Sequence, residues 1–242
     1  MINETILTFD CDWAPDFVIN NVINLLNEEK IKATFFITNK SQIIKKLREN
    51  KLFEVGIHPN FFRNSTQGSN EDSILNNLKQ IVPEAKSIRT HGLYQSTLLL
   101  KKFQEYEIEN DLSLFLPNTP NIVPHYSKFF NLYRFPYFWE DDVAMTEKSN
   151  WSFDDPLYHV NGLKIFNFHP IHVFLNSRDV ENYENLKKDI GLEQLNEENI
   201  KNFVNQSNEG TKSFFDEIIS YIKNKETYTI QSLREKTRKD KF

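Results

Sequence analysis

The chain has 242 residues, of which 39% are hydrophobic and 26% are charged, a composition typical of soluble globular proteins. This composition excludes a disordered, collagen-like or coiled-coil chain. The single cysteine, Cys11, excludes a disulfide framework and a zinc site built on thiolates, and the net charge of −5 predicts that nucleic acid is not a partner.

Apolar segments are short throughout the sequence. No apolar run approaches the roughly 18 residues that a membrane span needs, and the N-terminal residues lack the pattern of a secretory signal. We therefore expect a cytoplasmic protein with no membrane span. Only six glycines occur, and none forms a G-x-G-x-x-G or P-loop motif, so a nucleotide site built on a glycine loop is not expected.

Strand-like and helix-like stretches alternate along the chain. Short β-rich runs predict strands at residues 5–12, 33–38, 53–58, 87–91, 111–115, 132–138 and 163–168. Periodic apolar residues predict a helix that begins at Pro15 and further helices at residues 42–50, 71–82, 97–106 and 211–225. Residues 227–230 are a candidate final strand. No repeat or low-complexity linker interrupts the chain, so we expect residues 1–242 to form a single domain.

This alternation predicts the fold class. Strands separated by helices of roughly 10–15 residues are typical of βα units and of a mainly parallel sheet, so the chain is expected to be an α/β protein. An open doubly wound sheet and a closed barrel both fit the pattern, and about seven strands favour a (β/α) barrel. In either fold the functional residues lie at the carboxyl ends of the strands.

Polar side chains collect at those predicted strand ends. Four of the six histidines lie there, and the whole set comprises Asp10, Asp12, His58, Arg89, His91, Arg134, His169 and His172. A carboxylate or imidazole at the end of an apolar strand is costly to bury unless it is paired or binds a metal. Their convergence therefore indicates a functional site.

Asp10 and Asp12 are two residues apart on a predicted strand, so their carboxylates face the same side and Cys11 faces away. Two carboxylates that close require a cation between them or a proton on one of them. As the alternative, Asp12 or Asp16 caps the helix that begins at Pro15. Arg89 is a candidate partner for Asp10. Imidazole and carboxylate ligands without thiolate are typical of a catalytic zinc or a similar divalent ion, and a separate base and acid then permit metal-assisted hydrolysis.

Five short motifs occur in one order along the chain: TFDCD at residues 8–12, EVGIH at 54–58, RTHG at 89–92, RFPY at 134–137 and FHP at 168–170. This ordered set resembles the polysaccharide deacetylase superfamily, carbohydrate esterase family four with the NodB homology domain. The sequences around His58 and His169 are most similar to its WbmS-like branch, which is associated with the synthesis of lipopolysaccharide sugars. The resemblance covers residues 5–175, and residues 211–230 are similar to the family's usual ending.

The resemblance implies a distorted (β/α) barrel that removes an acetyl group from an N- or O-acetylated sugar with one divalent metal, zinc, or cobalt or nickel as alternatives. In the family's first motif the first aspartate is the general base and the second binds the metal. The resemblance thus implies that Asp10 is the base and Asp12 the metal ligand, although Cys11 separates them here. Arg89 matches the arginine that orients the base. His169 matches the histidine that acts as general acid, with His172 as the alternative.

The second family motif supplies two metal-binding histidines, and here the sequence departs from the family. His58 matches the first histidine, whereas Phe62 stands in the place of the second. Another alignment puts Glu54 in the first place and His58 in the second. We expect His91 to replace the missing metal ligand. Two other residues are alternatives for it: His172 and Asn60.

The expected substrate contacts are mainly aromatic. The candidates for walls on which a sugar ring stacks are Trp13, Tyr94, Tyr137 and Trp139, and His172 is a further candidate for substrate binding. The sequence leaves the oligomeric state open.

The hypothesis is a metal-dependent deacetylase of an acetylated sugar, a precursor of a cell-surface polysaccharide or of lipopolysaccharide. The alternatives are a sugar-binding protein that has kept the scaffold without the chemistry, and a metal-dependent hydrolase of another bond. Phe62 and the interrupted aspartate pair favour the binding protein. Retention of Asp10, Arg89 and His169 favours the enzyme, because a binding protein needs no base, orienting arginine and acid together.

Overall fold

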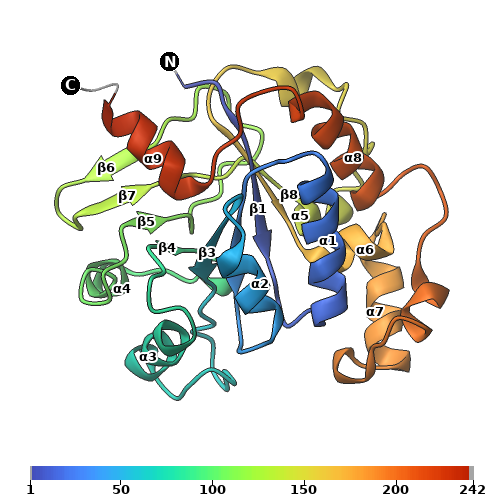
Figure 1. The fold of residues 1–242 in the computed structure, drawn as a ribbon, viewed down its shortest axis with the longest axis horizontal. Coiled ribbons are helices and arrows are strands. Elements are labelled where there is room, and N and C mark those ends of the chain that lie inside the picture. Colours follow the sequence, from blue (N-terminus) through green and yellow to red (C-terminus); the bar gives the residue numbers. More distant parts are fainter. Residues whose placement is uncertain (1, 240–242) are drawn as a thin grey trace.

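The computed structural model describes residues 2–239 (Figure 1). Its strands are β1 (Thr5–Asp10), β2 (Ala33–Ile37), β3 (Phe53–Ile57), β4 (Ser87–Ile88), β5 (Asn110–Asp111), β6 (His125–Ser127), β7 (Leu132–Arg134), β8 (Trp139–Glu140) and β9 (Lys164–Phe168). Its α-helices are α1 (Asp16–Glu28), α2 (Ile43–Glu49), α3 (Glu71–Ile81), α4 (Thr97–Lys102), α5 (Asp141–Thr146), α6 (Pro170–Leu175), α7 (Val180–Asp189), α8 (Thr211–Ile222) and α9 (Ile230–Lys239). Short 3₁₀ helices are η1 (His91–Leu93), η2 (Pro156–His159), η3 (Leu192–Gln194) and η4 (Asn199–Phe203).

The strands of the described residues form one nine-stranded sheet in the order β6-β7-β5-β4-β3-β2-β1-β9-β8. Every neighbouring pair is parallel except the β6–β7 hairpin, which is antiparallel. The α/β fold class is therefore confirmed, in the form of a curled, barrel-like sheet. The prediction of about seven strands is too low, because it lacks β6 and β8: of the segment 132–138 only β7 is a strand, and β8 begins after it, at Trp139.

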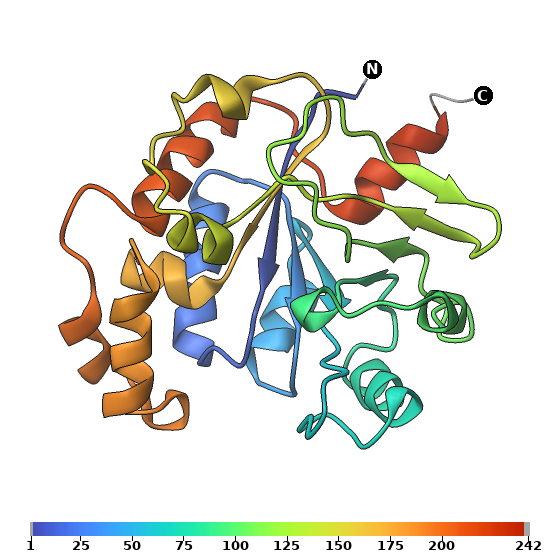
Figure 2. The same ribbon diagram turned by 180° about the vertical axis from the view of Figure 1, so that it is seen from behind.

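Helices cover one face of the central strands, and among the described residues no helix lies over β1 on the other face (Figure 1 and Figure 2). Helices α1 and α2 lie in front of β1–β3 in Figure 1, and the view from behind in Figure 2 shows β1 with no helix before it. Because the strands of a parallel sheet all point the same way, their carboxyl ends gather at one edge. Residues that follow β1, β3, β4 and β9 therefore come together there; Asp12 and His169, for example, are in contact although 157 positions separate them.

The core is rich in phenylalanine. Strands β2 and β9 are buried at every position, as expected for strands that are covered on both faces. Phe9 of β1 stacks on Phe35 of β2 with the ring centroids 4.8 Å apart. It also stacks on Phe168 of β9, the strand on the other side of β1. A smaller apolar cluster joins α1, α6 and α7 beside the main core; it contains Val18, Ile171, Leu175, Leu186, Leu195 and Ile200.

The C-terminal segment differs from the prediction. Residues 227–230 form no strand, and α9 begins at Ile230. The backbone N–H of Ile230 donates to Thr34 Oγ1 at 3.0 Å, and that of Gln231 donates to Glu54 Oε2 at 2.8 Å. These side chains satisfy the free N–H groups of the first helical turn, which fixes α9 against the amino ends of β2 and β3.

Among the described residues, no helix is both long enough and apolar enough to cross a lipid bilayer.

Candidate active site

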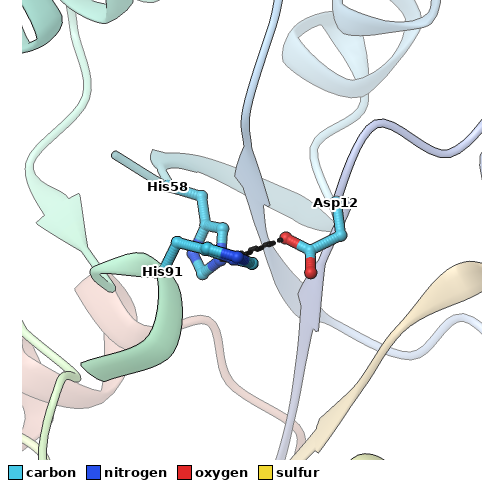
Figure 3. Close-up of side chains that lie close together, drawn as sticks. All are labelled: Asp12, His58 and His91. Atoms are coloured by element: carbon cyan, nitrogen blue, oxygen red, sulfur yellow. Dashed lines mark hydrogen bonds and ion pairs between the residues drawn. The ribbon is translucent and has the colours of Figure 1, made fainter. Parts of the chain in front are cut away.

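Three segments bring an aspartate and two histidines to one point at the carboxyl edge of the sheet. Asp12 follows β1, His58 follows β3 directly, and His91 opens η1 after β4. Asp12 Oδ1 lies 3.2 Å from His58 Nε2 and 3.3 Å from His91 Nδ1, and the two imidazole nitrogens are 3.3 Å apart (Figure 3). The three donor atoms thus form a nearly equilateral triangle.

The local backbone explains how Asp12 reaches this position. Asp12 and Trp13 have positive φ angles of 37° and 58°, so the chain turns sharply as it leaves β1. The backbone N–H of Trp13 donates to Thr38 Oγ1 at 3.1 Å, which fastens the turn to the end of β2. A carboxylate two residues beyond the strand can therefore point back over the sheet edge.

The donor set and its spacing fit a divalent metal ion. Zinc binds imidazole nitrogen and carboxylate oxygen at about 2.0–2.2 Å, and tetrahedral angles then require donor atoms about 3.3–3.5 Å apart. Within the described chain, Asp12 Oδ1 is buried and forms no well-oriented hydrogen bond. Burial by itself raises the pKa of Asp12, but the His58 and His91 imidazoles outweigh burial and hold this pKa well below its ordinary value. An anionic oxygen beside two imidazoles is a typical ligand set for zinc.

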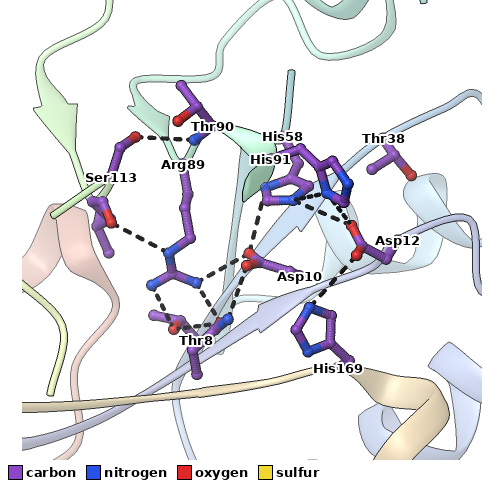
Figure 4. A network of polar contacts seen from close by, with 12 residues as sticks. Thr8, Asp10, Asp12, Thr38, His58, Arg89, Thr90, His91, Ser113 and His169 are labelled. Carbon is purple, nitrogen blue, oxygen red and sulfur yellow. Dashed lines mark hydrogen bonds and ion pairs between the residues drawn. The ribbon is translucent and has the colours of Figure 1, made fainter. Parts of the chain in front are cut away.

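Asp10 lies beneath this triangle in a buried ion pair (Figure 4). Arg89 Nη1 donates to Asp10 Oδ1 at 3.0 Å, and Asn167 Nδ2 donates to Asp10 Oδ2 at 2.8 Å. Arg89 is only 1% exposed, and its guanidinium lies between the rings of Phe36 and Tyr137 at 4.8 and 4.6 Å. Both oxygens of Asp10 are therefore held in fixed directions.

His169 follows β9 and faces Asp12 from the opposite side. Its Nε2 atom lies 3.5 Å from Asp12 Oδ2, while its Nδ1 atom lies 2.7 Å from Asp141 Oδ1. The backbone N–H of His169 also donates to Asp141 Oδ2 at 2.7 Å. Burial lowers the pKa of His169, but the carboxylates of Asp142 and Asp141 outweigh it and raise this pKa well above its ordinary value. The imidazole is thus oriented by Asp141, and the neighbouring carboxylates favour its protonated form.

Asn167, Glu140 and Asp141 belong to this site, and the sequence analysis did not single them out. Asn167 bridges Asp10 and Glu140, because its Nδ2 atom also donates to Glu140 Oε1 at 3.1 Å. Tyr137 Oη donates to Glu140 Oε2 at the same distance. Two signals point to these residues: Asn167 as the one polar side chain among the apolar residues 165–168 of β9, and the acidic run 140–142 directly after Trp139.

The alternative metal ligands have other partners. Glu54 lies near the amino end of β3 and binds Thr34 and α9, so the alignment that makes it a ligand is wrong. Asn60 Oδ1 accepts the N–H of Phe62 at 2.9 Å. His172 Nε2 lies 3.1 Å from Asp142 Oδ1, in a group with His169 and apart from the triangle.

The predicted substrate contacts divide into exposed and buried residues. Tyr94 is 40% exposed and packs against the exposed Phe62, and Trp13 lies edge-on to His91 at the rim of the Asp12–His58–His91 triangle. Their roles stay predictions, as does that of the buried His172. Tyr137 contradicts its prediction, because one face of its ring stacks on Phe115 and Arg89 covers the other, so no face is open to a sugar.

Comparisons with known proteins identify the class to which this fold belongs. The chain has the fold of the polysaccharide deacetylases, and the model of one family, WbmS-like polysaccharide deacetylase, matches residues 7–187. The chain belongs to this WbmS-like family. The family resemblance that the five motifs indicate is therefore confirmed.

Solved structures agree with this assignment. A protein of Bordetella bronchiseptica, WbmS, described as a polysaccharide deacetylase involved in O-antigen biosynthesis, is 32% identical, covers 90% of each chain and has a TM-score of 0.80. A Streptococcus mutans family-four esterase is 14% identical, covers 94% of this chain and 84% of its own, and has a TM-score of 0.50. The Bc1960 peptidoglycan N-acetylglucosamine deacetylase is 15% identical, covers 95% and 86%, and also scores 0.50. The last two show the fold alone. No curated protein matches the chain significantly.

Proposed function

We propose that the protein is a metal-dependent deacetylase that removes an acetyl group from an N- or O-acetylated sugar. The observation that supports this most directly is the Asp12–His58–His91 triangle, which has the donor types and spacing of a zinc site, between the Asp10–Arg89 pair and the His169–Asp141 pair. Zinc is the proposed ion, with cobalt and nickel as alternatives. The proposal treats residues 1–242 as one catalytic unit.

The proposed substrate is a precursor of a cell-surface polysaccharide or of lipopolysaccharide. The Bordetella relative is described as acting in O-antigen biosynthesis, and this supports a lipopolysaccharide sugar as substrate. The same proposal assumes a cytoplasmic enzyme. The exposed rings of Phe62 and Tyr94, next to His91, offer apolar surface on which a sugar can stack.

Two residues beside the triangle carry out the two proton transfers of the reaction: Asp10 accepts a proton and His169 donates one. A divalent ion held by Asp12, His58 and His91 would supply Lewis acidity, which polarises the acetyl carbonyl and lowers the pKa of water toward about 7. Asp10, whose two oxygens are fixed by Arg89 and Asn167, takes the proton of the attacking water. His169, whose Nδ1 is held by Asp141, gives the proton on Nε2 to the departing sugar nitrogen or oxygen.

Acetate release tests this function. We expect the purified protein with zinc to release acetate from nucleotide-linked N-acetylhexosamines or from N-acetylglucosamine oligomers, and Asp10→Asn to lower kcat by about 10²–10⁴-fold. Because Asp10 is not a ligand in this scheme, the variant should keep its metal. Asp154→Asn, which changes an exposed aspartate outside the site, is the matched control.

Two results would decide against the proposed roles. Loss of metal in Asp10→Asn would mean that Asp10 is a ligand rather than the base. Sugar binding by the wild type without any acetate release would support the alternative of a binding protein on a deacetylase scaffold.

A further inference from the structure

Gln67 is a buried polar residue to which the proposed reaction gives no role. It lies in the loop between β3 and α3, and only 5% of its surface is exposed. Asn77 Nδ2 of α3 donates to the backbone carbonyl oxygen of Gln67 at 3.1 Å, which fastens this part of the loop to the helix. Buried side-chain amides are almost always hydrogen-bonded, so the partners of this amide indicate what the residue does.

The side-chain amide of Gln67 joins the ends of two strands to the loop. Its Nε2 atom donates to the carbonyl oxygens of Thr38 at 2.7 Å and of His58 at 3.0 Å, and its Oε1 atom accepts from the backbone N–H of Asn60 at 2.6 Å. Both N–H donors and the oxygen are thus used, and two carbonyl partners on one side allow the amide only one orientation. Gln67 therefore fixes the residues that directly follow β2 and β3.

Two of these contacts lead to proposed metal ligands. His58 is itself a ligand, and Gln67 holds its carbonyl oxygen while its imidazole faces Asp12. Thr38 Oγ1 accepts from the backbone N–H of Trp13 at 3.1 Å, and this bond fixes the turn that carries Asp12. Figure 4 shows Thr38 with Asp12 and His58 at this edge of the sheet. Gln67 thus fixes the backbone of His58 directly and that of Asp12 through Thr38.

The third contact leads to His91. Pro59 lies between His58 and Asn60, the two neighbours that Gln67 binds, and its carbonyl oxygen accepts from the backbone N–H of His91 at 2.9 Å. Gln67 therefore holds the backbone to which His91 is bonded after the chain leaves β4. One buried amide is linked in this way to all three members of the Asp12–His58–His91 triangle.

We infer that Gln67 is a positioning residue that sets the spacing of the three proposed metal ligands. The inference rests on the proposed function, in which the triangle holds a divalent ion. Zinc binds nitrogen and oxygen ligands within a narrow range of about 2.0–2.2 Å, so a displacement of any of the three backbone segments weakens binding. Gln67 touches none of the metal-binding atoms, and it acts through the backbone of the ligands.

Gln67→Glu tests this role with almost no change in the size of the side chain. The variant keeps an oxygen that accepts from Asn60, but a carboxyl group has at most one proton and cannot donate to both Thr38 and His58. We expect the affinity for zinc, measured against a competing chelator, to fall about 10- to 100-fold. The visible absorption spectrum of the cobalt-loaded protein, which reports the geometry of the ligands, should change as well.

Asn176→Asp is the matched control. Asn176 is also buried, and its Nδ2 atom donates to the carbonyl oxygens of Asn205 and Ser207 at 3.3 and 3.0 Å, outside the triangle. The substitution removes the same kind of donor, so both variants should unfold at a lower urea concentration than the wild type. Only Gln67→Glu should alter the zinc affinity and the cobalt spectrum.

Amide hydrogen exchange in the metal-free protein separates this inference from the proposed function. The backbone N–H groups of Trp13 and His91 donate to residues that Gln67 holds, so their exchange should be about tenfold faster in Gln67→Glu and unchanged in Asn176→Asp. Gln67→Asn keeps the amide but is one methylene shorter. It is the milder second variant, and we expect the same changes in smaller measure.

Four results would contradict the inference. Wild-type zinc affinity in the folded Gln67 variants, or wild-type exchange at Trp13 and His91, would show that Gln67 does not position the ligands. An equal loss of affinity in Asn176→Asp would attribute the loss to general destabilisation. A wild type that binds no divalent metal would contradict the proposed function and this inference together, whereas zinc binding by the wild type beside an unaffected Gln67→Glu would contradict the inference alone.

Discussion

The Asp141 carboxylate controls how His169 holds its proton. It accepts from the backbone N–H and contacts Nδ1 of His169, both at 2.7 Å, and the pKa of His169 is raised well above its ordinary value, because the Asp142 and Asp141 carboxylates outweigh the effect of burial. Asp141→Asn removes one of these charges and destabilises the imidazolium. The pKa of His169 should then fall.

This change has a definite sign in the pH profile of kcat. His169 must be protonated to donate, so the alkaline limb should move to lower pH in Asp141→Asn, with the largest loss of rate at alkaline pH and the smallest where His169 is still protonated. The measurement is kcat against pH for the wild type and the variant. An alkaline limb that stays in place would show that another group is the acid.

At the residue scale, the sequence indicated side chains that are unusual for their position. Asp10 and His169 stand out because each ends an apolar strand. The sequence did not predict Asn167 and Glu140 as site residues, because their role depends on pairing between strands. Asn167 lies opposite Thr8 of β1 and Glu140 of β8. Spacing along the chain carries no information about that register.

At the element scale, η1 sets the position of His91. Gly92 follows His91 with φ at +59°, and a Cβ atom there would lie 2.6 Å from Phe62 Cε2. Gly92→Ala therefore adds backbone strain and a collision next to a proposed ligand, and we expect metal affinity to fall by about tenfold, equivalent to about 1.4 kcal/mol. Titration with zinc against a competing chelator measures this.

Gly191→Ala is the matched control for this change. Gly191 also has a positive φ, 78°, but a Cβ atom there would meet no heavy atom closer than 4.0 Å, and η3 contributes no residue to the Asp12–His58–His91 triangle. It should lower stability through strain and leave zinc affinity unchanged. Equal affinity in both variants would mean that η1 does not determine the position of His91.

Helix α9 belongs to the core although the sequence predicted a strand where it begins. Leu233 is fully buried in the main apolar cluster, so Leu233→Ala should lower the free energy of unfolding by about 2–5 kcal/mol. Leu98→Ala, at an exposed position of α4, should change it by less than about 0.5 kcal/mol. Urea unfolding measures both, and a similar small effect in both would show that α9 contributes little to stability.

The prediction of elements succeeded where the period of apolar residues was clear. Strands β1, β2, β3 and β9 and helices α1, α2, α3 and α8 lie close to their predicted positions. The two-residue strands β4, β5 and β8 are too short to show a period, so their limits depend on neighbouring strands. The start of α9 depends on Thr34 and Glu54, about 200 residues earlier in the chain, which no local pattern reveals.

At the scale of the whole molecule, the sheet assembles the proposed metal site from segments that are far apart in sequence. Asp12, His58 and His91 meet because β1, β3 and β4 end at the same edge of the sheet. The sequence predicted this edge and these residues, but the third ligand had alternatives, because the path of the chain after β4 cannot be read from spacing. The geometry supports His91 over His172 and Asn60.

Metal content of the purified protein tests this central claim most directly. We expect about one equivalent of divalent metal per chain in the wild type after incubation with zinc, and at least a tenfold loss of affinity in both His58→Ala and His91→Ala. His125→Ala, at an exposed histidine of β6, should bind like the wild type. A wild type that binds no zinc, cobalt or nickel, or a His91→Ala variant that keeps full affinity, would contradict the proposed metal site.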